Sequence, residues 1–419
     1  MRFSPRPRGI RVEAGAAVAS GCLIRGPPGR RGRSAQFAQS HEGTPDDPKL
    51  ADPKVGKTVN SPRALMAEIA ALPLDRPVRV LTLSADHERM ISISGMRAAL
   101  PEQVRLLSGP GCAASICPQA DLYQAIQLAS RHPLTLHVAE SMLRLPVGRD
   151  LPGAHCLEQA RREGADVRPI SAPVEAVMAA QREPWREMVL FVAGFETVLA
   201  PLAGMIVDGL PENLSLLISG RRVEPLIEQL LRREPRPFEA LLLPGNRCAV
   251  TGTSGWERIS DRYRVPAAVA GYTPSNILTA LHRLLRRHCA AEAGVDNCYR
   301  TLVRIGGHAM GRDQLSRVFE YADGEWRGLG RVPGSALRLR HAYRVMDADQ
   351  RYPDYRDDVG PETGEMPLGC ECAAVLLGEK TPRDCRQFSI TCQASSPYGP
   401  CMASADGTCS LHSAVDRVA

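Results

Sequence analysis

The residues best suited to chemistry in this chain are six cysteines near its C-terminal end. Of the thirteen cysteines in 419 residues, these six fall within the last fifty positions: Cys370, Cys372, Cys385, Cys392, Cys401 and Cys409. Glycine, proline, serine and threonine separate them, which is typical of loops that can direct several sulfur atoms toward one point. The pattern therefore predicts a site for sulfur chemistry rather than a hydrophobic core.

Three kinds of site take several thiols. Disulfide frameworks belong mainly to short secreted chains, and a chain of this length can bury its own core without them. Structural zinc also takes four thiolates, but it favours paired C-x₂₋₄-C spacings that this run lacks. Iron–sulfur clusters take four thiolates at widely differing spacings and suit a reduced cytoplasmic protein. A cubane cluster is favoured, with zinc and disulfides as alternatives, and two spare thiols could then cycle between dithiol and disulfide.

The spacing of the cysteines resembles that of a known family. C-x₁₄-C-x₆-C-x₁₆-C fits Cys370, Cys385, Cys392 and Cys409, with Cys372 and Cys401 interleaved. This pattern resembles the C-terminal domain of the HypD family of hydrogenase maturation factors. Further matching stretches lie elsewhere and extend the resemblance from about Arg63 to Cys409: Leu106–Cys112 (LLSGPGC), Gly194–Thr197 (GFET), Asn297–Arg300 (NCYR) and Trp326–Gly330 (WRGLG).

The resemblance implies a cofactor, a role and two partners. It implies a 4Fe-4S cluster on the four spaced cysteines and an accessory thiol pair at Cys372 and Cys401. It implies that the Fe(CN)2CO unit of nickel–iron hydrogenases is built transiently on this protein, in complex with a HypC-like small chaperone and with cyanide delivered by a HypE-like donor. The cluster and its thiols would relay electrons to the iron, so the protein would be an assembly factor rather than a conventional turnover enzyme.

Three positions depart from the family pattern, and one of them is Asn246, which stands where the family tends to have a histidine. The family carries a Cys-Gly-Gly-His-type motif whose cysteine helps to hold the iron, whereas this chain reads Ser84-Ala85-Asp86-His87. A serine hydroxyl is a poor ligand for soft low-valent iron. His87 keeps its position, where it could orient a group or be an ordinary solvated loop histidine. The family's C-x-x-C redox pair begins here at Cys112, but its second cysteine is replaced by Ser115.

Cys112 and Glu196 are the further candidates for catalysis. Cys112 follows the tight turn Gly109-Pro110-Gly111, where backbone N–H groups could lower the pKa of its thiol. The alternative is a small buried apolar side chain. Glu196 directly follows a strand, where it could act in a crevice or belong to a helix start capped by Thr197.

These departures leave two functions open. The first is maturation of a nickel–iron hydrogenase. The second is a divergent paralogue that keeps the cluster and the fold but acts as a non-catalytic scaffold or regulatory partner. Because Ser84 and Ser115 replace cysteines, we expect full maturation activity to require cysteine at both positions.

Alternating strands and helices must position these groups. Apolar runs predict eight strands: Val78–Leu83, Val104–Leu107, Leu134–Val138, Val167–Ile170, Met188–Val192, Leu214–Ile218, Ala240–Leu243 and Ala267–Val269. Helical periods lie between them: Ala120–Ser130, Leu157–Glu163, Val174–Gln181, Val223–Arg233 and Ser275–Arg287. Unbroken apolar strands alternating with helices indicate a doubly wound parallel α/β fold.

Eight strands suggest two α/β domains rather than one wide sheet. We expect a first domain over residues 61–160, a second over 161–295 with the seam near Gly153–Gly164, and a C-terminal cysteine-rich iron–sulfur domain over 296–419. Loops after parallel strands form binding crevices. The loops of interest here are Ser84–His87, Ser108–Cys117 and Gly194–Thr197.

Charge and composition exclude other classes. The net charge is +6, but residues 1–40 hold eight arginines and one acidic residue, which accounts for the whole excess. The remainder is therefore not basic enough to indicate nucleic-acid binding. Residues 1–60 are expected to be a disordered basic tail and linker. No apolar run approaches the roughly 20 residues of a membrane-spanning helix.

Overall fold

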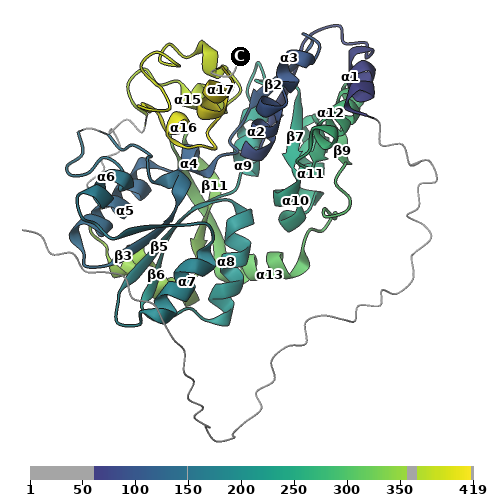
Figure 1. The fold of residues 1–419 in the computed structure, drawn as a ribbon. Helices are drawn as coiled ribbons and strands as arrows, with labels where there is room; N and C mark the ends of the chain where they lie inside the picture. The colour runs from purple at the N-terminus through teal and green to yellow at the C-terminus, as the bar shows by residue number, and fades with distance from the viewer. Residues whose placement is uncertain (1–60, 149, 356–365, 417–419) are drawn as a thin grey trace, which may run out of the picture. The chain divides into compact units, whose positions relative to one another are not determined.

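Two β-sheets organise the part of the chain that the computed structural model describes, residues 61–148, 150–355 and 366–416 (Figure 1). The first sheet has five parallel strands in the order β2-β1-β7-β8-β9. These strands are β1 (Val78–Thr82), β2 (Val104–Ser108), β7 (Ala240–Pro244), β8 (Pro266–Ala270) and β9 (Gly294–Asn297). The tail predicted over residues 1–60 lies outside the described residues.

The second sheet has six strands in the order β10-β11-β6-β5-β3-β4. Four parallel strands form its body, namely β3 (Thr135–Ala139), β4 (Val167–Ile170), β5 (Met188–Gly194) and β6 (Leu214–Arg221). The hairpin β10 (Phe319–Trp326) and β11 (Gly330–Leu339) adds to β6 in antiparallel sense. All eight predicted strands are present, and the predicted α/β class with parallel sheets is confirmed.

The strands do not follow the expected succession along the chain. β3 pairs with β4 and β5 rather than with β1, and β7 returns to the first sheet beside β1. The chain thus enters the second sheet before the expected seam at Gly153–Gly164 and leaves it again after β6. Apolar runs of similar composition serve both sheets, so burial alone did not indicate which sheet each strand joins.

Helices cover both faces of each sheet (Figure 1). Ser61 caps the first helix by accepting a hydrogen bond from Ala64 N at 3.2 Å, and Pro62 follows at N1. One face of the first sheet shares a core with α1 (Pro62–Ala70), α2 (Ala85–Ile93), α3 (Met96–Ala99) and α12 (Pro274–Cys289). Its other face packs on α9 (Glu224–Leu231) and α11 (Ser254–Tyr263).

The second sheet is wound in the same way. One face packs on α5 (Gln119–Arg131) and α6 (Leu157–Arg162), and the other on α7 (Pro173–Arg182), α8 (Glu196–Asp208) and α13 (Ala309–Val318). Shorter helices in the connections are α4 (Ala113–Ile116), η1 (Glu140–Met142), α10 (Gly245–Thr251), η2 (His341–Met346) and α14 (Ala348–Arg351). Among the described residues, no helix is both long enough and apolar enough to cross a bilayer.

Residues 366–416 lie against the first sheet. They form α15 (Cys372–Leu376), η3 (Pro382–Asp384), α16 (Pro400–Ala403) and α17 (Thr408–Asp416), joined by loops and without a strand. A Cβ on Gly378 would lie 3.2 Å from both Leu81 Cδ1 and Leu107 Cδ1, so the backbone passes directly over β1 and β2. Cys372 and Leu376 share the apolar core of that face.

Candidate functional site

A cavity of about 230 Å³ lies where strands of both sheets end. The three loops singled out in the sequence all line it, through Ser84, Cys112 and Thr197. Its remaining lining includes Asp86, Ser141, Asn246, Arg247 and Asp406. The predicted convergence of the strand-end loops is therefore observed, although strands of two sheets contribute.

Two glycines allow the second loop to approach the first. A Cβ on Gly109 would lie 2.6 Å from Thr82 O, and one on Gly111 would lie 2.6 Å from Ala85 N. Real Cβ atoms are not found so close to backbone, so only glycine fits at either position. This close crossing places Cys112 beside Ser84 at the cavity.

Cys112 is the N-cap residue of α4 and is only 6% exposed. Burial raises the pKa of its thiol, although hydrogen bonds with Ser115 and Ser404 act in the opposite direction. The expectation of a lowered pKa at this turn is not met, because desolvation outweighs the polar contacts. Cys112 is thus a protonated thiol when no metal or oxidant engages it.

His87 is buried, and it is not the solvated loop histidine considered above. Its Nε2 donates to the carbonyl oxygens of Gly271 at 3.1 Å and Ala270 at 3.3 Å, which ties α2 to the end of β8. Burial lowers the pKa of His87 to about 4, so the ring is neutral near pH 7. Its ring also lies 5.0 Å from that of Tyr272, whose hydroxyl accepts from Asn246 N at 2.8 Å. His87 therefore positions the wall of the cavity without lining it.

Glu196 is the first residue of α8, whose N-cap is Phe195 rather than the predicted Thr197. Burial and the nearby Glu224 raise the pKa of Glu196 to about 7, against the pull of Arg247. Glu196 Oε2 lies 3.8 Å from Arg247 Nε, and Arg247 stacks on the Phe195 ring at 4.2 Å. Glu196 thus holds the guanidinium that lines the cavity and can gain or lose a proton near neutral pH.

Four of the C-terminal cysteines form a hydrogen-bonded set of sulfur atoms: Cys370, Cys372, Cys401 and Cys409. Hydrogen bonding with the Cys372 thiol lowers the pKa of Cys370 and, together with Cys409, holds the pKa of Cys401 well below its usual range. Cys372 is the donor, and its own pKa is raised well above the usual range. We call these four residues the sulfur set.

Cys385 and Cys392 stand beside this set. Cys392 lies within electrostatic reach of both Cys370 and Cys385, and its Sγ accepts from Tyr398 N at 3.4 Å. A Cβ on Gly399 would collide with Cys370 Sγ, so the absence of a side chain at this position makes room for the sulfur atom. All twelve cysteines among the described residues are free thiols, including Cys112 and Cys117.

Ser115 connects the sulfur set to the cavity. Cys401 Sγ and Ser115 Oγ lie 3.2 Å apart, within hydrogen-bonding distance, and Ser115 also hydrogen-bonds Cys112. From the other side, Ser404 Oγ lies 3.5 Å from Cys112 Sγ. Ser115, at the position where the resemblance implies a second redox cysteine, thus stands between Cys401 of the sulfur set and Cys112 of the cavity.

Comparison with known proteins identifies the family. A family model named HypD, described as "Hydrogenase formation hypA family", matches residues 60–415. Hydrogenase maturation factor HypD of Azotobacter vinelandii is 34% identical over 366 residues, which cover 85% of this chain and 94% of that protein. HypD2 of Bradyrhizobium diazoefficiens is 33% identical over 349 residues, or 80% and 89% of the two chains. The chain belongs to the HypD family. HypD of Cupriavidus necator is similar at 33% over 341 residues, or 79% and 88%.

Several residues of this HypD-family site were missed in the sequence. Arg247 follows Asn246 in the first turn of α10, directly after β7, so the rule that selected residues just after strand ends could have found it. Ser404 and Asp406 reach the cavity from the C-terminal segment, and no local pattern marks them. Trp326, in one of the stretches that carry the resemblance, is fully buried, and its Nε1 donates to Ser335 Oγ at 2.8 Å.

Proposed function

We propose that this HypD-family protein is the scaffold and redox protein on which the Fe(CN)2CO unit of a nickel–iron hydrogenase is assembled, with a HypC-like chaperone and a HypE-like cyanide donor. The observation that carries the proposal is the contact between the sulfur set and the cavity through Ser115 and Cys112. Redox-capable sulfur atoms thereby adjoin a cavity that is large enough for a small metal complex.

The resident cofactor in this proposal is a 4Fe-4S cluster held by Cys370, Cys385, Cys392 and Cys409. When bound, such a cluster supplies single electrons. The donor set fits, because backbone N–H groups of Tyr398 and Gly399 point to Cys392 and that of Cys372 points to Cys370, which favours the thiolate form. Within the described residues no group of three or more His, Cys, Asp or Glu side chains has a preformed metal-binding geometry. The loops would therefore close on the cluster as it binds.

Cys112 is the residue best suited to hold the iron that is being assembled. Ser84 Oγ accepts from His87 N at 3.3 Å as the N-cap of α2, so its hydroxyl already serves the helix. Cys112 is the one cysteine among the described residues that line the cavity. A thiolate is a soft donor that suits low-valent iron. Iron bound there would also favour the deprotonated thiol over the buried protonated form.

Arg247 would recognise the diatomic ligands of the cargo. Its guanidinium lines the cavity, and its Nη1 is buried without a hydrogen-bond partner within the described part of the chain. The nitrogen of a cyanide ligand accepts hydrogen bonds and carries negative charge, so the unpaired Nη1 of Arg247 would bind it. Glu196 keeps this guanidinium in place and balances its charge.

Infrared spectroscopy tests the proposal. We expect bands of metal-bound CO and cyanide on the protein purified without air together with its HypC-like partner. Cys112→Ala should remove these bands. Cys156→Ala, which changes a half-buried cysteine outside the cavity, should leave them unchanged. Retention of the bands in Cys112→Ala would contradict the role of Cys112 as ligand.

The capping role of Ser84 also favours a second candidate, a scaffold or regulatory paralogue that binds the cluster but no cargo. In that case the wild-type complex would carry iron without CO or cyanide bands. It would also fail to restore hydrogenase activity in a strain that lacks its own factor. The double change Ser84→Cys and Ser115→Cys should then recover part of the activity, since it returns both missing thiols.

A further inference from the structure

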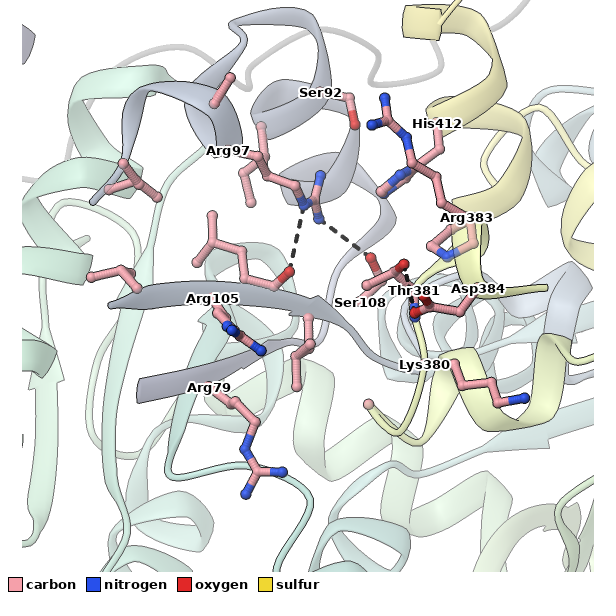
Figure 2. Close-up of a pocket in the computed structure, with 18 of the residues that line it drawn as sticks. Arg79, Ser92, Arg97, Arg105, Ser108, Lys380, Thr381, Arg383, Asp384 and His412 are labelled. Carbon is pink, nitrogen blue, oxygen red and sulfur yellow. Dashed lines mark hydrogen bonds between the residues drawn. The ribbon is translucent and has the colours of Figure 1, made fainter. Parts of the chain in front are cut away.

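The second region that stands out is the free edge of β2. In the described part of the chain β2 pairs only with β1 and forms the edge of the first sheet. All five of its residues, Val104–Ser108, line a cavity of about 900 Å³ (Figure 2). This cavity is separate from the one that holds Cys112, and we call it the edge cavity.

The backbone of β2 can be reached from the edge cavity. Leu106 O accepts a hydrogen bond from Arg97 Nε at 3.4 Å instead of pairing with another strand (Figure 2). This bond is long and therefore weak. The firm partner of Arg97 is Glu88, whose Oε2 lies 2.7 Å from Nη2. Arg97 can therefore release the carbonyl while keeping its ion pair. The Leu106 N–H points to the same side of the strand as its carbonyl.

The edge cavity has two walls of different origin. One wall is formed by Ile91 of α2, Arg97 of α3 and Leu100, which directly follows α3. Residues 378–384 form the other, which passes over the opposite face of β2. Successive side chains of a strand point to opposite faces. A chain lying along β2 would therefore send alternate side chains to the two walls.

The lining of the edge cavity carries both signs of charge. It carries five Arg or Lys side chains, Arg79, Arg97, Arg105, Lys380 and Arg383, against three carboxylates. Three of the cations already form ion pairs, Arg79 with Glu239, Arg97 with Glu88 and Lys380 with Glu371. Two of the carboxylates are engaged as well, since Glu379 pairs with Arg233 at 2.7 Å and Asp384 Oδ2 accepts from Thr381 N at 2.7 Å. Arg105 is exposed and forms no ion pair with any described residue. An acidic side chain laid beside β2 would meet an unpaired guanidinium.

We propose that the edge cavity binds an extended acidic segment of a partner protein, which adds to β2 as a sixth strand of the first sheet. Strand addition satisfies backbone groups at an exposed edge, and the two walls select alternate side chains. A five-residue strand at the spacing of a sheet fills roughly 800 Å³, which the cavity of about 900 Å³ accommodates. The proposal requires neither the cluster nor the Cys112 cavity and so goes beyond the maturation chemistry.

Peptide binding to the full-length protein tests it. The probe is a fluorescein-labelled hexapeptide of alternating glutamate and valine, and its binding is followed by anisotropy. A lysine-for-glutamate version should bind at least tenfold more weakly, because its cations would lie beside the unpaired guanidinium of Arg105. Two further versions are N-methylated on alternate residues. One of them should lose binding, because its methyl groups face β2, and the other should retain it.

Matched charge reversals locate the site on the protein. Arg105→Glu should weaken binding of the acidic peptide about tenfold. Arg317→Glu changes an exposed arginine of α13 outside the edge cavity and should leave binding unchanged. Amide hydrogen exchange of residues 104–108 should slow when the acidic peptide binds.

Three outcomes would overturn the proposal. The two N-methylated peptides could bind equally, which would exclude strand addition. Arg105→Glu and Arg317→Glu could weaken binding equally, which would indicate general attraction of charge. Protection of residues 104–108 could rise with protein concentration in the absence of peptide, which would make a second copy of this chain the occupant.

Discussion

The two sheets and residues 366–416 are stabilised by different kinds of contact. The sheets bury apolar side chains on both faces, and each face shares a core with helices. In residues 366–416, five of the buried side chains are cysteines. Apart from prolines, only six other apolar side chains there are buried: Val375, Leu376, Phe388, Met402, Ala403 and Leu411. The sheets therefore have apolar cores of their own, whereas the C-terminal segment buries few apolar side chains, and we expect its fold to depend on a ligand bound to its sulfurs.

The junction between the two regions is polar. Glu88 of α2 is 2% exposed, and it accepts from Ser108 Oγ at 2.6 Å, Arg97 Nη2 at 2.7 Å and His412 Nε2 at 3.1 Å. His412 belongs to α17, so one buried carboxylate joins the first sheet, α3 and the C-terminal segment. The difference between the regions can thus be tested at the cysteines, at this junction and within the sheets.

Cys385→Ala should have the largest effect, because it removes one of the four proposed cluster ligands. We expect the anaerobically purified wild-type protein to be brown with about four irons per chain, and the variant to hold less than one. Hydrogen exchange should become fast across residues 366–416 and stay slow in β1, β5 and β7. Cys289→Ala, at the exposed end of α12, should keep the iron and the slow exchange.

Stoichiometric zinc in the wild-type protein, with no visible charge-transfer band, would contradict the cluster. Slow exchange over residues 366–416 in Cys385→Ala would show that the segment folds without its sulfur ligands. The two regions would then not differ in whether they need bound ligands to fold.

Glu88→Gln should have the next largest effect. Burial favours the protonated carboxyl, but Arg97 and His412 outweigh it and hold the pKa of Glu88 well below its usual range. Removing the charge leaves the half-buried guanidinium of Arg97 without its carboxylate and should cost about 3–5 kcal/mol in the free energy of unfolding at pH 7. Glu158→Gln, in an exposed pair with Arg162, should cost less than about 1 kcal/mol.

Acid denaturation gives a second readout for Glu88. Because its folded pKa lies below the unfolded value near 4.5, its contribution is present above pH 4.5 and is lost as the pH falls through the folded value. The wild-type protein should therefore lose this part of its stability below pH 4.5. The Gln variant should not show this loss. If the free energy of unfolding fell with pH in parallel for the two proteins, Glu88 would be excluded as the junction.

The sequence predicted the sheets better than their connections because burial on both faces is visible in composition. β5 and β7 are unbroken apolar runs, and each was predicted within two residues. β9 reads Gly-Val-Asp-Asn and is only half-buried at a sheet edge, so no apolar run marks it. β10 and β11 are only partly buried along their length and follow the end of the helix–strand rhythm. Pairing between distant strands depends on contacts that a single sequence does not display.

The site was predictable to the extent that it follows strand ends. Cys112 lines the predicted crevice because the loop after β2 must open at that edge of the sheet. The contact of Ser115 with Cys401 joins residues 286 positions apart, and spacing gives no information on it. His87 was placed in the right loop, but its burial against Gly271 depends on the return of β8 to this sheet. Long-range contacts of this kind set the protonation state of each group.

Glu196→Gln tests the sheet region by its pH dependence. The pKa of Glu196 is raised to about 7, above the unfolded value of 4.5. Its protonated form therefore stabilises the fold, and this contribution is complete below pH 4.5 and is lost as the pH rises through 7. Between pH 5 and 8 the loss should be on the order of 2–3 kcal/mol in the wild-type protein and absent in the variant.

The quantity to measure for Glu196 is the difference in the free energy of unfolding between the variant and the wild-type protein at each pH. Burial lowers the pKa of His87 to about 4, so its contribution is complete above pH 6.5 and falls as the pH drops toward 4. This slope is opposite in sign and is common to both proteins, so it cancels in the difference. A difference that does not vary with pH would show that Glu196 is already ionised at pH 5.

The smallest expected effect is a change of covalent state without a change of fold, and it separates the spare thiols from the cluster ligands. Cys372 and Cys401 are hydrogen-bonded to each other and are the two left over when the four spaced cysteines bind a cluster. Cys401 carries the lowered pKa, so its thiolate is the attacking group when a disulfide forms.

After mild oxidation and alkylation, mass spectrometry should find Cys372 bridged to Cys401, with the sheets unchanged in hydrogen exchange. Cys156 and Cys289, which lie outside the sulfur set, serve as internal controls and should stay alkylated. A bridge between Cys370 and Cys409 would reverse the division between ligands and spare thiols. Cys370 and Cys409 would then be the redox pair, and the cluster proposed to stabilise the C-terminal segment would need other cysteines as ligands.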